Sequence, residues 1–236
     1  MITLYDYSKS GNCYKIRLLF SLLRIPYNRV EMNIKKGETG TEEFLNNISL
    51  NGKLPVLIIP KDYRKRDPNN PNINPNNNDY DDPNKIPEDG ITLTESNAIL
   101  TFISEGTPLF PSSSSFSNSI HNAKIMQWLF WEQFSLVPNI LPLRWWITYL
   151  NLGDDPKYLD QIVEKQKLGY EALNLMENHL KDKEFFVDDK FTIADIALYA
   201  NTHICEEAGY SIDSFPIIRA WLRRIEQMPG FIPIDD

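Results

Sequence analysis

Pro55 stands between a Gly-Lys loop and the apolar run Val56 to Ile59, and it restricts what this part of the chain can form. Proline cannot donate to a strand ladder, so it is confined to the first position of a strand or to a sheet edge. The position suits a cis Leu54-Pro55 peptide bond, which would turn the backbone so that Val56 presents its N–H and C=O groups at a strand edge. We therefore expect a site that pairs with an extended peptide.

A second signal follows a short β-type stretch, Ile91 to Thr94. Glu95-Ser96 comes next and precedes apolar residues with the spacing of a helix, namely Ala98, Ile99, Phe102 and Ile103. Ser96 is thus expected at a helix N-terminus, where free N–H groups and the helix dipole favour an anion and a hydroxyl adds a donor. A plain helix cap and a plain strand-initiating proline would explain each signal alone; together they predict a site for a peptide carrying a carboxylate.

The composition limits the class of protein. A chain of 236 residues with 42% hydrophobic content has enough apolar material for two domains. A net charge of −8 argues against nucleic-acid or anionic-membrane surfaces, because phosphate binding depends on an excess of Lys and Arg. Partners should therefore be small molecules or proteins.

Targeting and redox signals point to the cytoplasm. The first 25 residues contain charges that interrupt any signal-peptide core, and no run approaches 18 apolar residues. The two cysteines, Cys13 and Cys205, lie far apart in sequence and are expected as reduced thiols. The three histidines, His121, His179 and His203, show no metal-ligand spacing, so we expect no metal site.

The order of predicted elements indicates the fold of the first half. Strands are expected at Ile2 to Tyr5 and Tyr27 to Met32, with a helix from Gly11 to the stop at Pro26, and this β-α-β unit should be parallel and right-handed. A short helix at Thr41 to Ile48 comes next, then the Pro55 strand, the Ile91 strand and the Glu95 helix. The order βαβ then αββα, with proline opening the third strand, is typical of a thioredoxin-like α/β domain.

The predicted domains are 1–107 for this half, 108–118 for a linker and 119–236 for an all-helical half. Residues 61–89 are rich in Asn and Pro and have almost nothing to bury, so they are predicted to form a mobile surface insertion. In the second half, helices are expected near 119–150 (with a bend at Pro138 and Pro142), 156–181, 192–209 and 214–228. Thr192 to Asp195 is predicted to form a capping box.

Three segments carry a family resemblance that covers nearly the whole chain. They are Tyr5-Asp6-Tyr7-Ser8-Lys9-Ser10-Gly11-Asn12-Cys13-Tyr14-Lys15-Ile16-Arg17, Glu95-Ser96-Asn97-Ala98-Ile99-Leu100 and Gln127-Trp128-Leu129-Phe130-Trp131-Glu132-Gln133-Phe134. With the Phe-Thr-Ile-Ala-Asp-Ile-Ala stretch at 191–197, they resemble soluble glutathione transferases, the bacterial-type and theta-like members most of all. The 61–89 insertion departs from that pattern.

The resemblance implies a set of glutathione ligands. Leu54 and Pro55 would form the cis peptide, and Val56 would pair its backbone with the cysteinyl unit. Glu95 and Ser96 would bind the γ-glutamyl end. Lys53 would approach the glycyl carboxylate.

The group that activates glutathione is less constrained. It must hold the thiol as thiolate at the N-terminus of the first helix, where the dipole favours negative charge. Ser10 matches the serine of theta-like enzymes, which also have a cysteine three positions on. Tyr5, Tyr7 and Ser8 stay open as alternatives, and so does Cys13, because other members use a tyrosine or a cysteine in this region.

The resemblance implies a cytoplasmic, homodimeric transferase that joins glutathione, its co-substrate, to apolar electrophiles. An aromatic cluster on the first long helices of the second half would supply core residues and two or three pocket residues: Trp128, Phe130, Trp131, Phe134, Trp145, Trp146 and Tyr149. One alternative is a glutathione-dependent disulfide reductase or peroxidase. Another is a non-catalytic interaction scaffold, which the 61–89 insertion would serve.

Overall fold

A computed structural model describes residues 1–61, 63 and 90–236 and separates into two units. The first unit comprises residues 1–112 together with 233–236, and the second comprises residues 113–232. The division falls inside the connection that the sequence predicts as a linker. The predicted Asn- and Pro-rich insertion lies outside the described residues, apart from positions 61 and 63.

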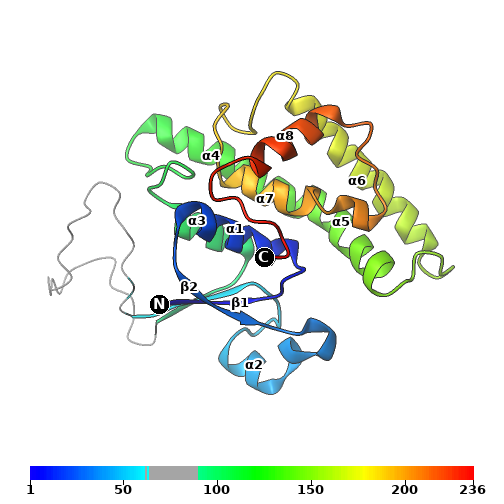
Figure 1. The fold of residues 1–236 in the computed structure, drawn as a ribbon, viewed down its shortest axis with the longest axis horizontal. Helices are drawn as coiled ribbons and strands as arrows, with labels where there is room; N and C mark the ends of the chain where they lie inside the picture. The colour runs from blue at the N-terminus through cyan, green and yellow to red at the C-terminus, as the bar shows by residue number, and fades with distance from the viewer. Residues whose placement is uncertain (62, 64–89) are drawn as a thin grey trace, which may run out of the picture. The chain divides into compact units, whose positions relative to one another are not determined.

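The first unit is built on one mixed sheet with the strand order β2-β1-β3-β4 (Figure 1). β1 (Ile2–Asp6) pairs in parallel with β2 (Tyr27–Glu31), and α1 (Gly11–Leu23) connects them. β3 (Val56–Ile59) pairs antiparallel with β1 on one side and with β4 (Ile91–Leu93) on the other. The predicted parallel β-α-β unit and the thioredoxin-like arrangement are confirmed.

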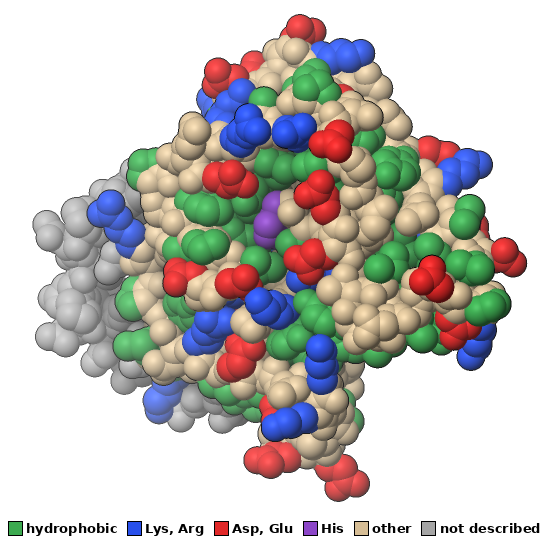
Figure 2. All heavy atoms as spheres, turned by 45° about the vertical axis from the view of Figure 1, so that its right-hand side comes forward, with side chains coloured by type: hydrophobic (Ala, Val, Ile, Leu, Met, Phe, Trp, Pro, Cys, Tyr) green, Lys and Arg blue, Asp and Glu red, His purple; other side chains and the backbone are tan. Residues whose placement is uncertain are grey.

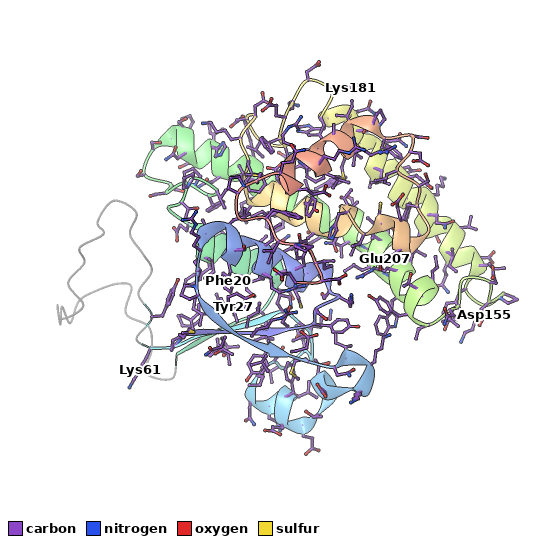
Figure 3. All side chains as sticks on the ribbon, in the orientation of Figure 1. Phe20, Tyr27, Lys61, Asp155, Lys181 and Glu207 are labelled. Atoms are coloured by element: carbon purple, nitrogen blue, oxygen red, sulfur yellow. The ribbon has the colours of Figure 1, made fainter. Side chains whose placement is uncertain are left out.

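Helices cover both faces of this sheet (Figure 1). α1 and α3 (Ser96–Ser104) lie side by side on one face, and α2 (Glu42–Asn47) lies on the other. The turn from α1 into β2 is fixed by the rings of Phe20 and Tyr27, whose centroids are 4.7 Å apart (Figure 3). Because α1 is covered by its neighbours, the side chains from Cys13 to Phe20 are all buried.

The position of β3 corrects one expectation. Sequence reasoning placed Val56 at a sheet edge, but β3 is an interior strand. Val56 pairs with Tyr5 of β1, whereas the ladder with β4 begins one residue later, at the pair Leu57 and Leu93. Pro55 therefore obeys the rule for proline by preceding the first residue of the strand, and Val56 lies at the end of the strand rather than along an open edge.

The second unit is helical. Its elements are α4 (Phe116–Trp131), the π-helical turn η3 (Glu132–Leu136), α5 (Val137–Arg144), the π-helical turn η4 (Trp145–Tyr149), α6 (Leu159–His179), α7 (Ile193–Thr202), the 3-10 turn η5 (Cys205–Ala208) and α8 (Pro216–Glu226). α4 begins three residues before the predicted start at 119, because the Ser115 side chain caps it by accepting a hydrogen bond from Asn118 N. The predicted helix over 192–209 ends at Thr202 and continues only as η5.

The predicted bend near Pro138 and Pro142 takes the form of π-helical turns on either side of α5. A proline inside a helix leaves the carbonyl four residues earlier without its N–H donor. For Pro142 that carbonyl belongs to Pro138, and the Lys165 ammonium of α6 donates to it at 2.9 Å. The proline that interrupts the helix thus also provides a contact with α6.

The predicted capping box opens α7. Thr192 is the N-cap, and Asp195 accepts a 2.9 Å hydrogen bond from the Thr192 backbone N–H. Every residue of α7 is buried, so the cap lies inside the core of the unit. The prediction of a buried helix that begins with its own cap is confirmed.

Residues 1–61 and 90–236 contain no helix with both the length and the apolar character that crossing a bilayer requires.

On the face drawn in Figure 2, Lys and Arg side chains alternate with Asp and Glu. Positive and negative groups are interspersed there.

Candidate functional site

Three chain segments meet at one end of the sheet in the first unit. β1 and β4 both run opposite to β3, so the end of β1, the start of β3 and the end of β4 lie together. The register confirms this, because Tyr5 pairs with Val56 and Leu57 pairs with Leu93. The loop after β1, the Pro55 segment and the Glu95-Ser96 pair are thereby brought to the same edge.

Ser10 is the N-cap of α1. Its Oγ accepts a hydrogen bond from Cys13 N at 3.3 Å, and its own N–H closes a turn onto Tyr7 O at 2.9 Å. A hydroxyl that accepts from a backbone N–H still has its own proton to donate. Ser10 is half-buried. Because it is the N-cap, it holds this donor at the positive end of the α1 dipole.

The other hydroxyl candidates have different surroundings. The Tyr5 ring packs edge-on against Phe44 of α2, with 6.0 Å between centroids, and lines an open cavity of about 250 Å³ on the α2 side. Ser8 is held by its backbone, since its N–H donates to Glu31 and its carbonyl accepts from Arg17. Tyr7 is half-buried at the first position of the turn that ends at Ser10.

The environment of Cys13 argues against a role as nucleophile. The side chain is completely buried. Burial raises the pKa of the Cys13 thiol far above its usual range, and the nearby Asp6 carboxylate raises it further. Reactive cysteines need partial exposure and a lowered pKa, so Cys13 has the properties of a structural thiol.

The Pro55 segment has the conformation that the sequence predicts. The Leu54-Pro55 bond is cis, Pro55 and Val56 are buried, and Lys53 is exposed. The turn before it is held by Asn51, whose Oδ1 accepts from Lys53 N at 3.0 Å. Lys53 is thus free to extend from a fixed backbone into solvent.

Glu95 and Ser96 form the start of α3. Glu95 has φ 66° and ψ 111°, which is rare for a residue other than glycine and marks local strain. Strain of this kind persists where the surroundings hold it and is common at ligand sites. Ser96 follows as the first helical residue and is almost fully buried.

Sequence reasoning missed one residue of this site. Lys15 of α1 is fully buried, and its Nζ lies 3.2 Å from Ser96 Oγ and 3.1 Å from Asn97 Oδ1. The sequence offered Lys15 only as a charge that interrupts an apolar segment. Its position beside three apolar neighbours, Ile16, Leu18 and Leu19, gave no indication of a partner 81 residues away.

Within residues 1–61 and 90–236, no group of three or more His, Cys, Asp or Glu side chains is arranged to hold a metal ion. Trp128 is half-buried and packs against Trp131, His179 and Phe186 within the second unit. Phe130 and Phe134 are exposed, at 68% and 86%.

Two family models match the chain. Residues 1–63 match the glutathione S-transferase N-terminal domain, and residues 145–229 match the glutathione S-transferase C-terminal domain. A crystal structure of a glutathione S-transferase from Pseudomonas fluorescens Pf-5 superimposes with a TM-score of 0.81 and 34% identity, covering 100% of this chain and 99% of that one. The chain belongs to the glutathione S-transferase family.

Two further relatives show the range of this family. A possible glutathione S-transferase from Rhodopseudomonas palustris has 36% identity and a TM-score of 0.80, covering 100% of this chain and 90% of that one. A maleylacetoacetate isomerase, maiA of Aspergillus fumigatus, is 26% identical over 234 residues, which is 96% of this chain and 86% of the relative. Family members similar to this chain thus carry both transferase and isomerase names.

Proposed function

We propose that this chain is a cytoplasmic, homodimeric glutathione transferase of the bacterial type that joins the glutathione thiolate to apolar electrophiles. The identities of 34% and 36% with two bacterial proteins support the subtype. In this proposal glutathione pairs with the Val56 backbone, and its γ-glutamyl end lies at Glu95 and Ser96. Lys53 faces the glycyl carboxylate.

The observation that carries the proposal is the geometry of Ser10. Its oxygen accepts from Cys13 N at the N-terminus of α1, and its hydroxyl, which faces the Cys13 thiol in this structure, would turn its proton to the glutathione thiolate. A hydrogen bond to a charged group contributes roughly 1.5 to 3 kcal/mol, which is about one to two pKa units. The glutathione thiol would shift from about 8.5 to about 6.5 to 7.5, so that a large fraction is thiolate at neutral pH.

The apolar electrophile would be bound by aromatic side chains of the helical unit. Trp145 and Tyr149 on η4 have ring centroids 5.4 Å apart, and Trp146 pairs with Tyr158 at the same distance. These rings are half-buried, so they retain apolar surface for a ligand. Trp128, by contrast, is enclosed by Trp131 and Phe186 and has a packing role in this proposal.

The test is a pH titration of thiolate absorbance with glutathione bound to wild type, Ser10→Ala and Ser10→Thr. We expect a thiolate pKa near 6.5 to 7.5 in wild type, a rise of at least about one unit in Ser10→Ala, and recovery in Ser10→Thr, which restores both hydroxyl and cap. Loss of the cap alone would lower the stability of Ser10→Ala and leave the thiolate pKa unchanged. An unchanged pKa in the alanine variant would therefore refute Ser10 as the donor and direct the search to Tyr7 and Ser8.

A maleylacetoacetate isomerase among the relatives supports a second candidate reaction. Maleylacetoacetate should therefore be assayed beside common electrophiles and a disulfide substrate. Disulfide reduction that persists in Cys13→Ser would assign any redox activity to bound glutathione rather than to the cysteine. Glutathione binding without any turnover would favour the scaffold alternative.

A further inference from the structure

The buried ammonium of Lys15 joins α1 to the N-terminus of α3. Lys15 has no exposed surface, although lysine is among the residues most rarely buried in full. Its Nζ contacts Ser96 Oγ at 3.2 Å and Asn97 Oδ1 at 3.1 Å. Both acceptors belong to the first two residues of α3.

This contact limits the direction of the Ser96 proton. An ammonium group has three donors and no acceptor, so Ser96 Oγ must accept in the bond with Lys15. The Ser96 hydroxyl hydrogen is then left for an acceptor other than Lys15. A serine that merely capped the helix would instead direct its lone pairs at the N–H groups of the first turn.

The same contact places positive charge at the helix terminus. The first N–H groups of α3 have no acceptor within the helix, and the dipole gives this end a partial positive charge. A buried ammonium beside them acts in a low-dielectric setting, where its field is screened less than at the surface. Ser96 is 5% exposed and Lys15 is fully buried, so Ser96 is the more accessible member of the pair.

We propose that Lys15 is a positioning residue for the γ-glutamyl carboxylate of glutathione and acts through Ser96. Lys15 holds Ser96 Oγ as an acceptor, so the hydroxyl proton is directed to the carboxylate, and its charge favours the anionic ligand. The inference rests on the proposed binding of glutathione at Ser96. It assigns a binding role to a residue on α1 that cannot touch the ligand from its fully buried position.

The experiment compares two ligands across three proteins. The ligands are glutathione and its analogue in which the γ-glutamyl carboxylate is a primary amide. The proteins are wild type, Lys15→Met and Lys190→Met, the last removing one charge from an exposed lysine of the second unit. Dissociation constants are measured by calorimetry at one pH and ionic strength, and each melting temperature is recorded.

We expect Lys15→Met to weaken glutathione binding by about 10-fold or more and to change binding of the amide analogue less than about 3-fold. Lys190→Met should bind both ligands as wild type does. An equal loss for both ligands in Lys15→Met would show a merely structural role and overturn the inference. Unchanged glutathione affinity would overturn it as well.

Two further outcomes are decisive. If Lys15→Met does not fold, Lys15→Gln keeps a donor for Ser96 without the charge and should show a smaller loss that is still selective for glutathione. Failure of both variants to fold would assign Lys15 to the core alone and overturn the inference. If wild type binds no glutathione, the proposed function itself fails, and this result is distinct from an unselective effect of the Lys15 variants.

Discussion

Arg17 Nη2 donates a 2.6 Å hydrogen bond to the carbonyl oxygen of Ser8. The same buried guanidinium donates from Nη1 to the main-chain oxygens of Ile234 and Asp236, each at 2.9 Å, and its Nε lies 3.2 Å from Asp6 Oδ2. One side chain therefore ties the end of β1, the loop that leads to Ser10 and residues 233–236 into the first unit. The sequence predicts those last residues in the helical half, and the structure places them in the first unit.

Arg17→Met should lower the free energy of unfolding by about 3 kcal/mol. The change leaves Asp6 buried with Arg29 as its remaining cationic neighbour, at 2.6 Å. Burial raises the pKa of the Asp6 carboxyl, and both arginines lower it, so removing one makes the ionised form more costly. Urea unfolding measures the loss. The double variant with Asp6→Asn should recover part of it, and a loss below about 1 kcal/mol in Arg17→Met would contradict this view of the ion pair.

Removal of residues 233–236 should loosen the loop that carries Ser10. Deletion takes away both main-chain acceptors of Arg17 Nη1, and backbone amides at positions 8–13 should then exchange with solvent about 10-fold faster, as a local loss of about 1.4 kcal/mol implies. Asp235→Ala is the matched control, because it keeps both main-chain acceptors of Arg17 and removes the exposed ion pair with Lys9, which contributes about 0–1 kcal/mol. Equal exchange in wild type and the deletion variant would show that the loop is held without this segment.

Neither cysteine should react with a thiol reagent in the folded protein. Cys13 and Cys205 are both free and buried. Burial raises the pKa of Cys13 above its usual range and that of Cys205 to about 12, so little thiolate forms at pH 8. A colorimetric disulfide reagent should detect no thiol in native protein and both after unfolding in guanidinium. Rapid native labelling at Cys13 would instead support its alternative role in redox chemistry.

Local signals explain what the sequence could predict. Pro55, the Ser96 helix start and the Thr192 capping box act within a few residues, so their backbone consequences can be read from neighbouring positions. The contact between Lys15 and Ser96 spans 81 residues and leaves no periodic trace. The same is true of Arg17, which in sequence is one more charge in a helix and in the structure joins three segments.

Asp195→Asn should destabilise the second unit by about 2–3 kcal/mol. Asp195 Oδ1 accepts from Phe186 N and Trp221 Nε1, both at 3.1 Å, while Oδ2 accepts from Thr192 N at 2.9 Å and from the Thr192 hydroxyl at 3.2 Å. An asparagine can keep one oxygen acceptor, but its amide nitrogen would then face two donors. Urea unfolding followed by tryptophan fluorescence measures the change. Asp189→Asn, at an exposed carboxylate nearby in sequence, is the control and should cost far less.

His203 should make stability depend on pH between about 4 and 6.5. Burial lowers the pKa of His203 to about 4, and Arg144 lowers it further, while the Tyr199 carbonyl and Glu207 act in the opposite direction. Between these values the unfolded chain binds a proton that the folded chain does not, so stability is complete above about pH 6.5 and is lost as the pH falls toward 4. At pH 5 this single group should cost about 2 kcal/mol relative to pH 7.5.

The measurement compares urea unfolding of wild type and His203→Gln across that range. Glutamine cannot acquire the charge, so the difference in unfolding free energy between the two proteins should change by about 2 kcal/mol from pH 7.5 to pH 5. Asp195 titrates in the same window with the opposite sign, because burial raises its pKa to about 6 and the folded chain then holds the extra proton. The net profile of wild type is therefore shallow, and only the difference between the two proteins isolates His203. Parallel profiles for wild type and variant would show that His203 gains its proton without unfolding cost.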